Sequence, residues 1–173
     1  MIKFIIPNEE YLQSYKEAYD EFIIHNVTTY HFTDSSSCDI FEKFDNYRFE
    51  RSLPPDRVRE DKYWLVDDER AYFIGELALR HRLNDALLSG GGHIGYGVRY
   101  SEWNRGYGTM MLAYAIERAK ELGIKTLQIT CNDDNIASAR VIEKNGFILI
   151  DKPVVSDGGK DVVRRRYRKT ILQ

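Results

Sequence analysis

The chain has few cysteines and no long apolar run. Its two cysteines, Cys38 and Cys131, lie far apart and are too few for a disulfide framework or for a zinc site built on paired thiolates. No stretch approaches the length of a membrane-spanning helix, and the N-terminus lacks the apolar core of a signal peptide. These absences predict a cytoplasmic protein that holds no metal and has no membrane partner.

Charge of either sign is not in large excess. The formal net charge of -2 gives no overall attraction to nucleic acid, so any anionic ligand must be held by a local site. The basic run Arg164–Lys169 falls on a predicted strand, whose alternation divides it between two faces. We therefore expect no nucleic-acid partner.

The composition and apolar periodicity predict one folded domain over residues 1–173. Hydrophobic residues make up 43% and charged residues 30% of the chain, which is ordinary for a globular protein. Periods near 3.6 predict helices, and strict alternation predicts strands. Strands are predicted at 2–6, 63–66, 71–79, 93–100, 126–130, 147–150 and 162–171. Helices are predicted at about 8–26, 40–51, 109–122 and 136–145.

A glycine loop, Asn104-Arg105-Gly106-Tyr107-Gly108-Thr109, joins the strand that ends at Tyr100 to the following helix. The unpaired N–H groups of a helix N-terminus bind anions, and the glycines allow close approach. Arg105 adds a guanidinium, which suits a pyrophosphate. A tight turn that needs positive φ is the alternative. No Walker lysine follows the glycines, and Met111 stands where a dinucleotide fingerprint needs a small residue, so neither ATP nor NAD is indicated.

The stretch from Val98 to Thr109, followed by Asn135 to Phe147, resembles the paired signature of the GNAT superfamily of N-acetyltransferases. In that family the coenzyme A pyrophosphate is held by a loop with the pattern Arg/Gln-x-x-Gly-x-Gly/Ala. Gly106 and Gly108 occupy the glycine positions here, whereas Trp103 replaces the first residue. The resemblance implies that the backbone of the loop binds the cofactor.

A second signature consists of an Asn, a short helix and the pattern Lys-x-Gly-Phe. It is matched by Asn135, Lys144, Gly146 and Phe147. Many members carry a Tyr two residues before the Lys as general acid for the leaving thiolate, but this chain has Ile142. Ser138 occupies a position where a subgroup similar to ribosomal-protein and small-amine acetyltransferases has serine. Its hydroxyl is the candidate donor to the sulfur, and a water molecule is the alternative.

The resemblance covers most of the chain and is weakest over residues 27–60. Within the family, the chain is similar to one bacterial subgroup. The resemblance implies an α/β (α+β) fold with a mixed, mostly antiparallel central sheet of about seven strands and about four helices. The implied cofactor is acetyl-CoA, with the pantetheine arm and the oxyanion bound by the backbone of the strand. The expected cofactor residues are Val98, Arg99, Tyr100, Asn104, Arg105, Gly106, Tyr107, Gly108, Thr109, Asn135 and Ser138.

Attack by an amine on a thioester requires an unprotonated amine, and three residues near the predicted strands are candidate bases. Glu76 interrupts an apolar strand and so faces either solvent or a cavity. His93 shares a strand face with two glycines, where a packing role is the alternative. His81 is either structural or substrate-facing. Tyr96 is a candidate proton donor.

The sequence therefore favours an enzyme that transfers acetyl from acetyl-CoA to a primary amine by direct attack. A non-catalytic acyl-CoA-binding sensor is the alternative, because Tyr is absent at position 142 and no unambiguous base is present. A structural interaction domain without cofactor is a third hypothesis. The acceptor, a small molecule or a peptide, is not named by the sequence, and both a monomer and a homodimer remain open.

Overall fold

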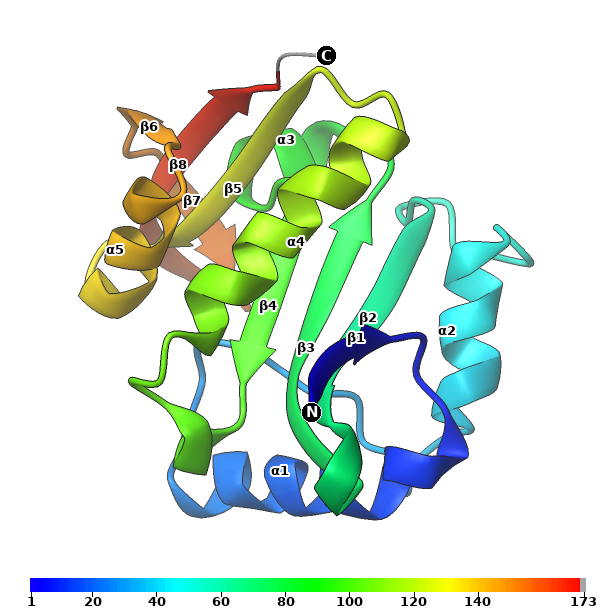
Figure 1. Cartoon of the computed structure of the whole chain (residues 1–173). Helices are drawn as coiled ribbons and strands as arrows, with labels where there is room; N and C mark the ends of the chain where they lie inside the picture. The colour runs from blue at the N-terminus through cyan, green and yellow to red at the C-terminus, as the bar shows by residue number, and fades with distance from the viewer. Residues whose placement is uncertain (172–173) are drawn as a thin grey trace.

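The computed structural model describes residues 1–171, so the last two residues of the predicted domain lie outside the described part. That part contains eight strands and five α-helices (Figure 1). The strands are β1 (Ile2–Ile5), β2 (Glu60–Asp67), β3 (Tyr72–Arg80), β4 (Ile94–Val98), β5 (Thr126–Asn132), β6 (Ile148–Asp151), β7 (Val154–Asp157) and β8 (Lys160–Thr170). The helices are α1 (Leu12–Ile24), α2 (Ile40–Arg48), α3 (Asp85–Gly90), α4 (Tyr107–Glu121) and α5 (Ile136–Lys144).

The strands form two halves. One half has the order β1-β2-β3-β4 and the other β5-β8-β6, with β7 also paired to β8, and all of these pairs are antiparallel. The halves meet just before β4, where the His93 N–H donates to the Gln128 carbonyl at 2.8 Å. Within the described residues no ladder joins β4 to β5 beyond that point. The predicted α/β fold with a mostly antiparallel sheet is confirmed; all of the described strand pairs are antiparallel, and the sheet is split between β4 and β5.

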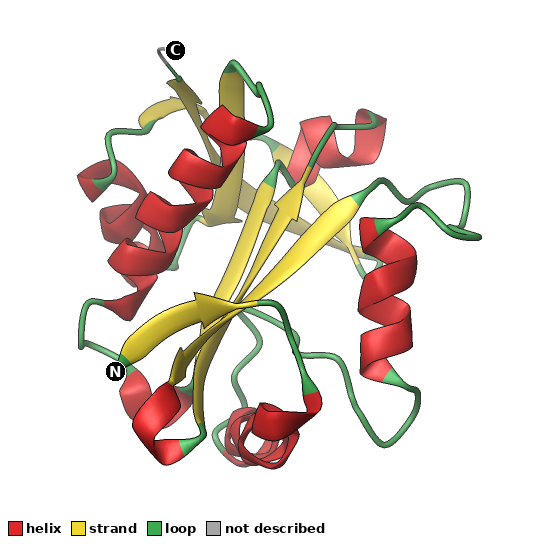
Figure 2. Cartoon of the chain, turned by 45° about the vertical axis from the view of Figure 1, so that its right-hand side comes forward, coloured by secondary structure: helices red, strands yellow, loops and turns green. Residues whose placement is uncertain are grey.

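Helices cover both faces of the first half (Figure 2). On one side α4 packs on β3 and β4, and its buried residues recur at helical spacing: Met111, Leu112, Ala115 and Ala119. On the other side α1 and α2 contact β3 and β2, and the Tyr15 and Trp64 rings stack with centroids 4.7 Å apart. Because side chains alternate along β2, Leu65 packs in the hydrophobic core under α4, and Trp64 packs in a second core under α1 and α2.

Several boundaries differ from the sequence prediction. The helix predicted at 40–51 ends at Arg48, and Glu50 and Ser52 have positive φ values of 50° and 52°, outside the helical region. The strand predicted at 93–100 ends at Val98, because residues 100–102 form a 3₁₀ turn. Tyr100 therefore does not continue the strand face of Tyr96. Two short elements, α3 and β7, were not predicted.

No helix within residues 1–171 is both long enough and apolar enough to cross a membrane.

Two local features matter for the candidate site. Asn104 and Gly106 both have left-handed backbone, with φ of 62° and 83°, and they turn the chain from the end of β4 into α4. Asn135 caps α5, because its side-chain oxygen accepts the Ser138 N–H at 3.1 Å.

Candidate functional site

The gap between β4 and β5 is bridged by side chains rather than by backbone. The hydroxyl oxygens of Tyr96 on β4 and Ser138 on α5 lie 3.0 Å apart. On the other edge of β4, the Arg99 N–H donates to the Ile74 carbonyl at 2.8 Å. Because an antiparallel ladder alternates its bonds, the N–H groups of Tyr96 and Val98 point away from β3 and into the gap. The gap thus offers two hydroxyls and free strand amides.

The glycine loop lies beside this gap. The first helical bond of α4 runs from the Met110 N–H to the Gly106 carbonyl at 3.1 Å. Within residues 1–171, the N–H groups of residues 106–109 have no carbonyl or side-chain partner. A β-carbon built on Gly106 meets no atom within 4 Å, so the space around it is open. The loop has the backbone form of an anion cradle.

Gly108 connects the loop to the hydroxyl pair. A β-carbon at Gly108 would lie 3.3 Å from Tyr96 Cε2, so the glycine allows the Tyr96 ring to pack against the start of α4. Burial, opposed by the Ser138 hydrogen bond, raises the pKa of Tyr96 to about 12. The phenol therefore stays protonated at neutral pH and can act as a hydrogen-bond donor. The structure brings together Tyr96, Gly108, Ser138 and, through its cap, Asn135.

Residues 12–148 match the acetyltransferase (GNAT) domain family. The chain is a member of the GNAT family. No curated protein sequence matches it significantly. The fold is shared with solved acetyltransferases. A microcin C7 self-immunity acetyltransferase, MccE, in complex with acetyl-CoA and AMP has a TM-score of 0.74 at 17% identity, over 98% of this chain and 92% of that one.

Two further solved structures concern ribosomal protein L7/L12. The acetyltransferase of Salmonella typhimurium that modifies the N-terminal serine of this protein has a TM-score of 0.72 at 15% identity, over 98% of this chain and 95% of that one. RimL in complex with coenzyme A has a TM-score of 0.71 at 15% identity, over 98% and 94%. At such identities the likeness shows the fold alone.

Trp103 replaces the Arg or Gln that the GNAT loop pattern carries, and its side chain points back to the strand. The indole N–H donates to the Val98 carbonyl at 2.8 Å, and the ring lies 4.8 Å from that of Tyr100. Trp103 therefore braces the loop against the end of β4. Arg105 Nη1 lies 3.2 Å from the buried Glu102 carboxylate, while most of the Arg105 side chain is exposed.

Two other predicted cofactor residues of this GNAT chain direct their side chains away from the gap. The Arg99 side chain extends to α1, where it donates to Glu21 Oε1 at 2.7 Å and to Ser14 Oγ at 3.0 Å. The Tyr100 ring stacks on His25, with centroids 3.7 Å apart. The remaining loop residues, Tyr107 and Thr109, are half-buried at the start of α4.

The sequence predicted that Glu76 faces either solvent or a cavity, and in the structure it does neither. It is fully buried within a polar cluster, which we call the Glu76 cluster. Its Oε1 accepts from Tyr30 Oη at 2.8 Å and from Lys62 Nζ at 2.9 Å, and its Oε2 accepts from Trp64 Nε1 at 3.0 Å. Both oxygens are thus occupied by donors. This arrangement favours a structural role for Glu76 over proton abstraction.

His93 lies at the closed end of the gap. Its Nδ1 accepts the Gln128 N–H at 3.1 Å, which requires that this nitrogen carry no proton. Burial, and to a lesser extent Arg80, lower the pKa of His93 to about 4. The imidazole is therefore neutral at pH 7 and holds the two halves of the sheet together. His81 lies elsewhere, 2.9 Å from Asp61.

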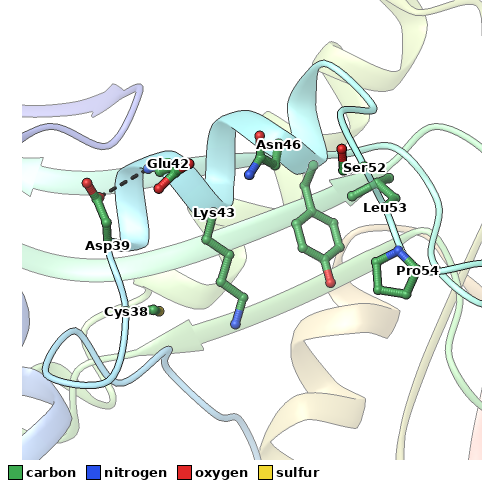
Figure 3. A pocket seen from close by; sticks show the side chains of 9 residues that line it. Cys38, Asp39, Glu42, Lys43, Asn46, Ser52, Leu53 and Pro54 are labelled. Carbon is green, nitrogen blue, oxygen red and sulfur yellow. Dashed lines mark hydrogen bonds between the residues drawn. The ribbon is translucent and has the colours of Figure 1, made fainter.

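Tyr30 and Lys62 are the neighbours of the site that the sequence did not single out. Tyr30 belongs to the irregular segment between α1 and α2, where no periodicity predicts which side chains turn inward. A shallow hollow of about 400 Å³ lies further along, on α2 and residues 52–54 (Figure 3). None of the predicted site residues line it, so it is distinct from the glycine loop.

Proposed function

We propose that this GNAT domain is a cytoplasmic N-acetyltransferase that moves the acetyl group of acetyl-CoA to a primary amine by direct attack. The observation that carries the proposal is the Tyr96–Ser138 hydroxyl pair, which lies in the gap between β4 and β5 and touches the glycine loop through Gly108. Family membership supplies the reaction class. The geometry supports the roles proposed below for individual residues.

The loop is suited to the diphosphate of the cofactor. The free N–H groups of residues 106–109 and the positive end of α4 favour an anion, and the exposed Arg105 is close enough to add a charge-assisted bond. The pantetheine arm then lies in the gap, where the backbone of Tyr96 and Val98 is unpaired by β3. The thioester oxygen needs a donor, and the Val98 N–H, which points into the gap, can supply it, while the Val98 carbonyl already accepts from Trp103.

The proposed reaction forms one bond from the amine nitrogen to the thioester carbon and breaks the carbon–sulfur bond. The Val98 N–H stabilises the negative charge that develops on the carbonyl oxygen. The Ser138 hydroxyl donates a hydrogen bond to the departing sulfur, and Tyr96, protonated at neutral pH, donates to Ser138. The proton of the amine passes to solvent water, because Glu76 and His93 are both engaged elsewhere.

A non-catalytic acyl-CoA sensor is the second candidate. It is favoured by the hydrogen bonds that occupy Glu76 and His93 and make them unsuitable as general bases. A sensor needs the loop and the gap but no base. The two functions share the binding site and differ only in turnover. Their separation therefore requires an assay of transfer as well as an assay of binding.

Calorimetric titration with acetyl-CoA, coenzyme A and ATP tests the site, and a thiol-release screen over amines tests the reaction. The screen includes small polyamines, amino acids, aminoglycosides and a peptide with N-terminal serine. We expect micromolar binding of both coenzyme A forms, no binding of ATP, and release of thiol with at least one amine. Binding without release for any amine favours the sensor, and absence of binding excludes both functions.

A further inference from the structure

Tyr30 lies flat on the face of β4 that is opposite to the hydroxyl pair. A β-carbon at Gly97 would lie 2.7 Å from Tyr30 Cγ, and one at Gly95 would lie 3.6 Å from Tyr30 Cε2. The absence of side chains at the two glycines therefore leaves room for the Tyr30 ring, which occupies the volume that side chains at these positions would fill. Any larger residue at position 97 would displace the ring.

The Tyr30 ring is held firmly in this position. Its hydroxyl donates to Glu76 Oε1 at 2.8 Å and accepts from Lys62 Nζ at 3.2 Å, and Lys62 itself is nearly buried. The ring also packs edge-on against Phe32, with centroids 5.4 Å apart. A side chain fixed at both its hydroxyl and its ring loses little further entropy when a ligand arrives.

The position of Tyr30 relative to the gap follows from strand alternation. Tyr96 points to the face covered by α4 and α5, where it contacts Gly108 and Ser138. Gly95 and Gly97 point to the opposite face, as alternate residues of a strand must. A thioester bonded to the Val98 N–H would lie at the edge of β4 between these faces. Because α4 packs on β4 at the first face, whereas α1 and α2 contact mainly β3 and β2 at the second, the acyl group and the incoming amine are placed at the second face, beside Tyr30.

We propose that Tyr30 is a specificity-determining residue, whose ring forms the wall that limits the acyl group to acetyl, and that Lys62 and Glu76 are positioning residues that hold this wall. The inference rests on the proposed function and adds to it a choice among acyl donors. Longer acyl chains would extend into the volume that the ring occupies. A pocket that fits acetyl rejects each extra methylene by about tenfold or more when the wall cannot move.

The test is calorimetric titration of wild type, Tyr30→Ala and Tyr30→Phe with acetyl-CoA and butyryl-CoA, which needs no knowledge of the acceptor. In wild type we expect butyryl-CoA, whose acyl group has two more methylenes, to bind at least about a hundredfold more weakly than acetyl-CoA. Tyr30→Ala should reduce this ratio to about threefold or less, because the ring volume is released. Tyr30→Phe keeps the ring but loses its bonds to Glu76 and Lys62, so it should give a ratio between those of wild type and Tyr30→Ala.

The outcomes distinguish this inference from the function on which it rests. If wild type binds both acyl-CoA forms equally well, or if folded Tyr30→Ala keeps the wild-type ratio, Tyr30 is not the wall while the acetyltransferase proposal stands. If wild type binds neither form, both proposals fail. Circular dichroism establishes that each variant is folded, and Tyr30→Leu, which retains more apolar volume, replaces Tyr30→Ala if that protein does not fold.

Discussion

The hydroxyl oxygens of Tyr96 and Ser138 lie 3.0 Å apart and connect the two halves of the sheet across a gap that the backbone does not bridge. Each residue comes from a different half, Tyr96 from β4 and Ser138 from the helix that follows β5. Closure of the gap at this point depends on both side chains. Their substitution therefore tests the site directly.

Ser138→Ala should lower turnover by about tenfold or more while leaving the affinity for acetyl-CoA nearly unchanged, because a donor to the leaving sulfur acts in the transition state. Ser138→Thr retains a hydroxyl and should retain most of the activity. If Tyr96 acts through Ser138, Tyr96→Phe in the Ser138→Ala background should cost little more. Steady-state rates and calorimetric affinities measure both effects. Equal activity of Ser138→Ala and wild type would remove Ser138 from the mechanism.

Gly106→Asp should weaken coenzyme A binding by about tenfold or more, since it places a carboxylate against the cofactor phosphates and strains a left-handed backbone. Gly123→Asp is the matched control. Gly123 lies beyond the opposite end of α4, has φ of 71° against 83° at Gly106, and also has open space around its missing β-carbon. Both variants carry similar strain, so only the difference in affinity reports the site. A similar loss of affinity in both variants would contradict the proposed cradle.

Glu76→Gln should reduce the free energy of unfolding by at most about 3–5 kcal/mol, because it removes the nearer of the two carboxylates beside the buried Lys62 ammonium and leaves Glu60, 3.5 Å away, as its charged partner. Although burial alone lowers it, the neighbouring Glu76 and Glu60 raise the pKa of Lys62 well above its ordinary value, so the charge persists. Glu69→Gln changes an exposed carboxylate and should cost at most about 1 kcal/mol. Urea unfolding measures both. The double variant Glu76→Leu with Lys62→Met should lose less stability than the two single changes added together.

Stability should depend on pH through His93. The pKa of His93 is about 4 in the folded protein and ordinarily 6.5, so the unfolded chain binds the extra proton between these values. The stability that neutral His93 contributes is fully present above pH 6.5 and is lost as the pH decreases toward 4. The total loss in the free energy of unfolding is roughly 3 kcal/mol. His93→Asn, whose amide oxygen can still accept the Gln128 N–H, should flatten this part of the profile. Urea midpoints between pH 4 and pH 7 provide the comparison, and parallel profiles would show that His93 is not responsible.

The sequence predicted the elements that carry local signals. The apolar stripe of α4, the glycine turn before it and the alternation that separates Tyr96 from Gly97 all follow from spacing and residue type. The partner of Gly97 could not be predicted in this way, because Tyr30 reaches it from an irregular segment far away in the sequence. The same limit applies to Glu76, since its strand pattern gave no sign of the three donors that surround it.

Trp103 shows a different limit. The residue was visible as a departure from the GNAT pattern, but its bond to the Val98 carbonyl depends on how the chain folds back after the 3₁₀ turn. Sequence comparison places the two residues near one another along the chain without placing the indole. The division of the sheet at His93 and Gln128 is likewise a tertiary property, set by contacts between strands that are not consecutive.

The brace between Trp103 and the end of β4 has a kinetic consequence. The indole bond, the left-handed Asn104 and the left-handed Gly106 shape the loop through contacts and backbone angles of the chain itself. An anion therefore meets a receptor that is already shaped, and little conformational entropy remains to be lost on capture. The encounter should proceed in a single bimolecular phase, with a rate that responds to ionic strength through the exposed Arg105 rather than to the time a loop needs to fold.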